Sequence, residues 1–170
     1  MYKFNDFKLG ETEDEIEIES SEDNISATNA MVIQASRKID IISRKLDPVI
    51  YDTPEFIEAI KQLILKSSRA KVRVLVFEPE QIVKRGHRLV SLSMDMSSYI
   101  TINVPNKEHA AFNESLLIAD AAGYIYRKES ERFEGKVNFN DKRASRFLIH
   151  EFDQMWEKSR SDPYLRRALL

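Results

Sequence analysis

The segment at residues 72–77, Val-Arg-Val-Leu-Val-Phe, most narrows what this chain can fold into. Apolar, mostly β-branched residues fill nearly every position, which is typical of a strand covered on both faces of a sheet. A helix pattern precedes it, in which Thr53 suits the N-cap, Pro54 the first helical position and Glu55 the first turn. A doubly covered strand beside an amphipathic helix predicts a layered α/β domain.

The patterns along the rest of the chain agree with that class. An apolar face predicts a helix over residues 26–37, and β-branched residues predict a strand over 38–43. A second helix is predicted to begin near Gly86 and His87, followed by a strand over 99–104. Residues 115–119 and 124–127 indicate a hairpin in which Gly123 is expected to supply the unusual backbone angles, and Asn140 or Asp141 can cap the last long helix. We therefore expect a mixed sheet flanked by helices.

Composition excludes several classes of function. The chain has 170 residues, 42% of them hydrophobic and 32% charged, which fits one globular domain. It has no cysteine, so disulfides, thiolate zinc sites and thiol catalysis are ruled out. No apolar run approaches the roughly 18 residues of a membrane span, and the N-terminus does not resemble a signal peptide. We expect a cytoplasmic protein that is not associated with a membrane.

Charge is distributed unevenly along the chain. Residues 1–23 carry nine acidic residues and two lysines, a balance of −7, whereas the remainder has a balance of +5. We therefore divide the chain into an acidic N-terminal arm, residues 1–23, and a domain, residues 24–170. The arm can be a solvated, partly disordered tail, or it can cover a basic surface as a mimic of an anionic ligand. The alternation over residues 15–19 also suits a short edge strand.

Cofactor and metal motifs are absent from the sequence. The three histidines lack metal-ligand spacing, and the four glycines form no phosphate-binding loop. We therefore expect no cofactor, no metal and no standard catalytic set.

One motif carries most of the functional information. Residues 113–120 read Asn-Glu-Ser-Leu-Leu-Ile-Ala-Asp at the start of a predicted core strand. This segment resembles the active-site motif of the phospholipase D superfamily, His-x-Lys-x-x-x-x-Asp, with Asn113 in place of the nucleophilic His and Ser115 in place of the phosphate-binding Lys. Asp120 alone matches. An amide is not a useful nucleophile and a hydroxyl carries no charge, so the resemblance implies a degenerate active site.

The resemblance covers about residues 26–160, one phospholipase D-like half-domain, and implies a homodimer that buries the Asp120 edge. Within the superfamily the chain resembles an uncharacterised bacterial branch often fused to GNAT-type acetyltransferases. The segments that carry this resemblance are residues 85–89, 117–120, 123–127, 132–135, 156–159 and 162–166.

Five basic residues are candidates for binding an anion. Arg85, His87 and Arg88 surround a predicted helix start, and Arg127 and Arg132 flank the end of the hairpin. The same residues also suit a solvated helix start and structural ion pairs.

Three functions follow from these residues. The first is a catalytically inactive binding or regulatory module for an anionic ligand or partner. The second is an enzyme that uses His87 as a base with Asp47 or Asp120, and the third is a structural partner of a separate acetyltransferase. Binding to nucleic acid is weakly supported, since the chain lacks a strong basic excess.

Overall fold

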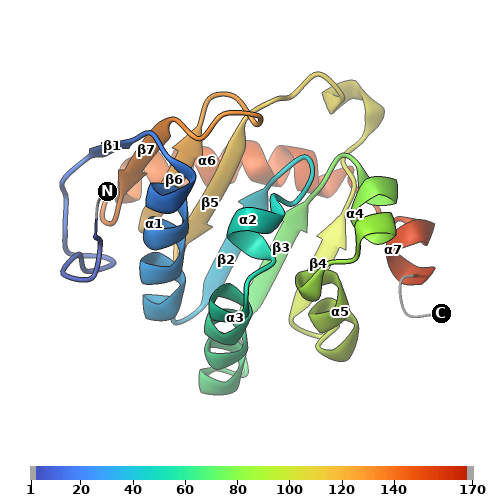
Figure 1. The fold of residues 1–170 in the computed structure, drawn as a ribbon, viewed down its shortest axis with the longest axis horizontal. Helices are drawn as coiled ribbons and strands as arrows, with labels where there is room; N and C mark the ends of the chain where they lie inside the picture. Colours follow the sequence, from blue (N-terminus) through green and yellow to red (C-terminus); the bar gives the residue numbers. More distant parts are fainter. Residues whose placement is uncertain (1–2, 168–170) are drawn as a thin grey trace.

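The computed structural model describes residues 3–167, which form a seven-stranded mixed sheet flanked by helices (Figure 1). The strand order is β1-β7-β6-β5-β2-β3-β4, with β2, β3 and β4 parallel and the other pairs antiparallel. The expected α/β class with a mixed sheet is confirmed. Among the described residues no helix is long and apolar enough to cross a membrane.

The strands are β1 (Ile16–Ile18), β2 (Lys38–Ile42), β3 (Lys71–Leu75), β4 (Ile100–Asn103), β5 (Ser115–Ala119), β6 (Gly123–Arg127) and β7 (Gly135–Asn138). The helices are α1 (Ser21–Gln34), α2 (Pro48–Tyr51), α3 (Pro54–Lys66), α4 (Pro79–Arg85), α5 (Arg88–Asp95), α6 (Lys142–Glu157) and α7 (Pro163–Arg167), and a 3-10 turn spans Lys107–His109.

The sheet has a hydrophobic core on each face. Helices α1–α5 lie in front of the sheet in Figure 1, and α6 passes behind it. Alternate strand residues divide accordingly: Leu117 and Ile125 pack toward the larger core, and Ile118 and Tyr124 toward Phe152 on α6. In β6 the two tyrosines, Tyr124 and Tyr126, therefore lie on one face of the sheet and Ile125 on the other.

A buried ion pair on the α6 face was not predicted. Arg73 Nε donates to Asp40 Oδ1 over 2.7 Å, and Asp40 is 1% exposed. The same guanidinium lies over the rings of Phe152 and Trp156, at 4.7 and 5.5 Å, and pairs with Asp153. These contacts connect β2 and β3 to α6 through a single arginine, and they balance the buried charge of Asp40.

Helix α1 begins earlier than the predicted 26–37. Its N-cap is Ser20, whose hydroxyl accepts from the amide of Asp23, and Glu22 and Asp23 occupy the first turn, where acidic residues favour the helix dipole. The helix ends at Gln34 rather than Arg37. The acidic first turn belongs to the same charge block as residues 1–23, and this obscures the helix start in the sequence.

The edge-strand interpretation of the N-terminal segment is confirmed, because β1 pairs antiparallel with β7. Phe4 is fully buried, and its ring stacks on Phe139 at 5.9 Å. Residues 3–20 therefore do not form a detached tail.

The hairpin turn differs from the prediction. Positive φ angles occur at Asp120 and Ala121, both 54°, and not at Gly123. Gly123 instead lies where a Cβ atom would come within 2.7 Å of Leu9 Cδ1 and 3.1 Å of the Asn138 carbonyl oxygen. This glycine is required for close packing rather than for an unusual backbone angle.

Candidate anion-binding site

Three adjacent strands bring polar residues together at one end of the sheet. The antiparallel register aligns Ile42 with Leu116 and Ser115 with Arg127, so the end of β2, the start of β5 and the end of β6 coincide. Alternation places Ser115 and Arg127 on the face of the larger core, the side of α1 to α3. Ser43, which directly follows β2, falls on the same side by the same alternation.

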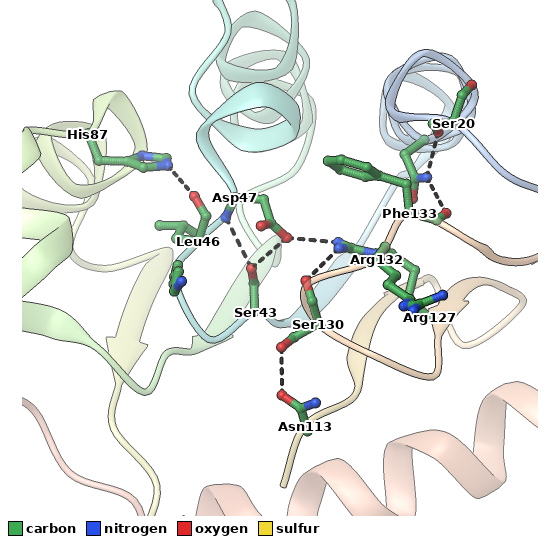
Figure 2. A network of polar contacts seen from close by, with 12 residues as sticks. Ser20, Ser43, Leu46, Asp47, His87, Asn113, Arg127, Ser130, Arg132 and Phe133 are labelled. Carbon is green, nitrogen blue, oxygen red and sulfur yellow. Dashed lines mark hydrogen bonds and ion pairs between the residues drawn. The ribbon is translucent and has the colours of Figure 1, made fainter.

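Arg127 is fixed by contacts from each of its three side-chain nitrogens. Nη1 donates to Asp47 Oδ2, Nη2 to the Ser130 carbonyl and Nε to the Arg132 carbonyl, each over 2.7 Å. The guanidinium lies 5.1 Å from the centre of the Phe133 ring, and the residue is 3% exposed. Figure 2 shows this network between the hairpin and the loop that follows β2.

The loop 43–47 supplies the acidic partner. The hydroxyl of Ser43 accepts from the Asp47 amide at 3.1 Å and lies 3.4 Å from Asp47 Oδ2. Leu46 has a φ of 51°, a left-handed conformation that turns the loop and costs a residue with a side chain about 1–2 kcal/mol. The loop therefore directs the Asp47 carboxylate toward Arg127 (Figure 2).

Asn113 and Ser115, which the motif resemblance aligns with a His and a Lys, lie beside this network. Asn113 accepts hydrogen bonds from Ser130 at two atoms, its side-chain Oδ1 at 2.6 Å and its carbonyl at 2.7 Å. The Ser115 hydroxyl is buried and has no hydrogen-bond partner within residues 3–167. Both positions thus hold neutral groups, and neither can act as a nucleophile at phosphorus in the manner of an imidazole.

A pocket of about 300 Å³ opens above this end of the sheet. Its basic residues are Arg44, Lys45 and Arg127, and its acidic residues are Asp47, Glu78 and Glu131. The acids lie 3.9 Å from Arg44, in the case of Glu78, and 4.0 Å from Lys45, in the case of Glu131. Arg44 is fixed by other contacts, since its Nη1 donates to the Ala110 and Phe112 carbonyls at 3.1 and 2.6 Å and its guanidinium lies 4.7 Å from the centre of the Phe77 ring. Sequence reasoning missed Arg44 and Lys45. The signal available was their position directly after the predicted strand 38–43, since loops at strand ends commonly carry functional residues.

Asp120 lies at the opposite end of β5 from Asn113 and Ser115. Its carboxylate accepts from the backbone amides of Ser36, Arg37 and Lys38, at 2.8–2.9 Å. Its side chain thus secures the connection between α1 and β2. Asp120 makes no part of the pocket described above.

Arg85, His87 and Arg88 lie on the other side of loop 43–47, around a separate hollow of about 510 Å³. His87 is the N-cap of α5: Nδ1 accepts from the Leu89 amide at 3.1 Å, and Nε2 donates to the Leu46 carbonyl at 2.9 Å. Burial lowers the pKa of His87 below its usual range, so the ring is neutral. With both nitrogens engaged by backbone atoms, this ring is not positioned as a general base beside Asp47 or Asp120.

The neighbouring arginines are also engaged. Arg88 contacts Asp52 through its amide and its guanidinium, at 3.0 and 3.1 Å, so a carboxylate of the chain already occupies the start of α5. Arg85 donates to the Lys45 carbonyl at 2.8 Å, and the exposed Arg132 pairs with Glu129 at 3.1 Å. The five predicted residues are therefore distributed over separate places, and only Arg127 lines the pocket at the strand ends.

No set of three or more potential ligand residues within 3–167 could hold a metal ion.

The fold resembles solved structures of the phospholipase D family. Nuc, a phospholipase D family member from Salmonella typhimurium, matches with a TM-score of 0.58 and 14% identity over 88% of this chain and 97% of its own. NucT from Helicobacter pylori matches with a TM-score of 0.60 and 11% identity over 88% and 99%. The shared fold is thus that of phospholipase D-like proteins, as the sequence resemblance implied.

A third similar structure is TrmBL2, an archaeal chromatin protein described with a novel mode of DNA binding. It matches with a TM-score of 0.66 and 14% identity over 92% of this chain, which spans 56% of the TrmBL2 chain. No curated protein matches in sequence. The sequence profile of a domain family of unknown function, DUF7931, matches residues 20–168, and the chain belongs to this family.

Proposed function

We propose that this protein is a catalytically inactive phospholipase D-like module that binds an anionic ligand or partner at the ends of β2, β5 and β6. The observation that carries the proposal is the pocket wall formed by Arg127 and Arg44, whose guanidiniums are both fixed by hydrogen bonds to backbone carbonyls, beside the less constrained Lys45. Two fixed guanidiniums next to one adaptable ammonium group suit the recognition of phosphate or carboxylate oxygens.

The absence of catalysis follows from the two replaced residues. A phosphoryl-transfer site of this type needs a nucleophile and a cation at the positions of Asn113 and Ser115. Asn113 is instead an acceptor for Ser130, and the Ser115 hydroxyl is buried without charge. The pocket therefore retains groups that can hold an anion while lacking those that would break a phosphate ester.

The charge balance of the pocket narrows the class of ligand. Three carboxylates, those of Asp47, Glu78 and Glu131, offset the three cations. A doubly charged phosphate monoester would be repelled by these carboxylates, whereas a singly charged group would displace only the loosely held Glu78 or Glu131. We favour a phosphodiester, the group that the nucleic-acid backbone presents. TrmBL2, an archaeal chromatin protein with a novel mode of DNA binding, has a similar fold and supports the same choice.

The test is fluorescence anisotropy with labelled single- and double-stranded oligonucleotides at low and moderate salt. An Arg44→Ala/Lys45→Ala variant should weaken binding at least tenfold, because it removes two pocket cations and leaves the Arg127 network in place. The matched control is Lys61→Ala/Arg88→Ala, which removes two cations around the hollow beside α5. Binding that survives the first variant and is lost in the second would overturn the site.

A second arm tests the chemistry. Wild-type protein should not hydrolyse bis(p-nitrophenyl) phosphate above the buffer rate, and turnover abolished by Asn113→Ala would contradict an inactive module.

The N-terminal segment should be probed by neutralisation, Glu17→Gln with Glu19→Gln, rather than by deletion. Deleting it would remove the buried Phe4 and strand β1.

Two partner interactions belong to the same proposal. The homodimer can be tested by light scattering, and a dimer that joins two pockets would use the Asn113 end of β5, since Asp120 lies at the other end and is engaged within its own chain. A separate acetyltransferase as a partner, in a cytoplasmic setting, is the alternative function. Co-purification of such an enzyme without nucleic acid would favour it.

A further inference from the structure

A second groove lies on the opposite face of the sheet, between β6 and the first half of α6. It has a volume of about 670 Å³. We call it the tyrosine groove, since Tyr124 and Tyr126 project from β6 on the side of α6. Phe147 and Leu148 of α6 form one wall, and Phe147 is 63% exposed, an unusual position for a large apolar side chain. An aromatic surface with an exposed apolar wall is typical of a ligand site rather than of a solvated surface.

The charges around the tyrosine groove differ between its two tyrosines. Beside Tyr124, Glu15 accepts from the phenol and is neutralised by Lys136 at 3.5 Å. Beside Tyr126, Glu114 accepts from the phenol, and Glu151 of α6 is close enough to raise the pKa of that phenol. Neither Glu114 nor Glu151 has an ion-pair partner among residues 3–167. The Tyr126 end of the groove therefore carries two carboxylates without an ion pair, whereas the cations of the groove are Lys136, which is paired with Glu15, and Arg143 of α6.

The phenols of Tyr124 and Tyr126 both remain protonated and act as hydrogen-bond donors in the tyrosine groove. Burial, together with hydrogen bonding and the nearby carboxylates, raises the pKa of Tyr124 and of Tyr126 to about 12. Each phenol therefore donates a hydrogen bond to its glutamate. A carboxylate has two oxygens and several lone pairs, so Glu114 can accept from a ligand while it accepts from Tyr126.

From this arrangement we infer that the tyrosine groove binds an organic cation, an alkylammonium or guanidinium group on an aliphatic stem. The cationic head would lie between Glu114 and Glu151, over the ring of Tyr126, where charge and the aromatic quadrupole both favour it. The stem would pack on Phe147 and Leu148. The site is independent of the proposed anion pocket, because it lies on the other face of the sheet and shares no lining residue with it.

The inference is tested by calorimetric titration with two guanidinium probes. Agmatine presents the group on a free small molecule, and acetyl-Gly-Arg-Gly-amide presents it on a peptide. The same tripeptide with citrulline is a neutral control of nearly the same shape. We expect saturable, salt-sensitive binding of agmatine, and at least tenfold weaker binding of the citrulline peptide than of the arginine peptide. Equal binding of both guanidinium probes would indicate that the groove reads a protein side chain, and binding of agmatine alone would indicate a small amine.

The variants locate the site. Glu114→Gln/Glu151→Gln keeps an acceptor for the Tyr126 phenol but removes both charges, and should weaken agmatine binding at least tenfold. Glu157→Gln, an exposed change at the end of the same helix, should leave the affinity within twofold. An unchanged affinity in the double variant, equal binding of the citrulline peptide, or no saturable binding of either probe to the wild type would overturn the inference. Oligonucleotide binding measured on the same double variant separates this result from the fate of the anion pocket.

Discussion

Arg127 combines burial with three hydrogen bonds, so its replacement should reveal how much the site network stabilises the fold. Arg127→Met keeps much of the side-chain volume and removes the ion pair with Asp47 and the donors to the Ser130 and Arg132 carbonyls. Losing one partner of a buried pair costs about 3–5 kcal/mol. Asp47 is 21% exposed, so water can partly replace the lost donor, and we expect about 3 kcal/mol.

The assay is urea unfolding followed by the fluorescence of Trp156, the single tryptophan, whose ring stacks on Phe152 at 5.7 Å. A loss of about 3 kcal/mol is a large part of a typical stability of 5–15 kcal/mol, and it should lower the urea midpoint without changing the slope. Asp47→Asn completes a double-mutant cycle, and we expect the two changes to be non-additive by about 1–2 kcal/mol. A loss below about 1 kcal/mol for Arg127→Met, or additive changes, would refute the view that this network is structurally important.

Three further predictions concern residues that the sequence marked for other reasons. Burial lowers the pKa of His87 in the folded protein, so the unfolded chain binds a proton first as the pH falls below about 6.5. The free energy of unfolding should therefore decrease from that pH down to the lower pKa of the folded state. The same dependence of the free energy of unfolding on pH in His87→Asn would contradict this. Gly123→Ala should cost about 1–2 kcal/mol in urea unfolding, because the new methyl group contacts the Asn138 carbonyl. An unchanged stability would show that β6 and β7 can move apart easily at this position. Asp120→Ala removes the acceptor of three backbone amides and should cost about 2–4 kcal/mol in urea unfolding. The control is Asp95→Ala, at an exposed position. Equal effects of the two substitutions would refute the structural role of Asp120.

The parts of the fold that the sequence predicted are those in which local pattern and tertiary environment agree. The strand at 71–75 is apolar because both faces of the sheet are covered, and the cap at Thr53 acts through the nearby amide of Phe56. The start of α1 was missed because its capping residues lie within an acidic block. Helix α4 was missed because, at seven residues, it buries only Ile82 and shows no apolar stripe.

The site was harder to predict because its contacts are long in sequence. Arg127 was a candidate, but its partner Asp47 is 80 residues away, and only the strand register brings the two together. Asp120 matched a motif, yet its partners lie more than 80 residues earlier, in a connection that no local pattern marks. Arg44 and Lys45 were missed because a basic pair after a strand is common on ordinary surfaces.

The network also determines what a lysine at position 115, the residue that the motif resemblance would place there, would contact. A lysine at position 115 would lie in a site that is 2% exposed, directly opposite Arg127 in the strand register. Two cations there would repel each other, and the Asp47 carboxylate is already paired with Arg127. The positive charge of the Arg127 guanidinium thus disfavours a phosphate-binding lysine at position 115. At this end of β5 and β6 the buried arginine network therefore disfavours a cation at position 115, and the other two cations of the pocket, Arg44 and Lys45, come from the loop after β2.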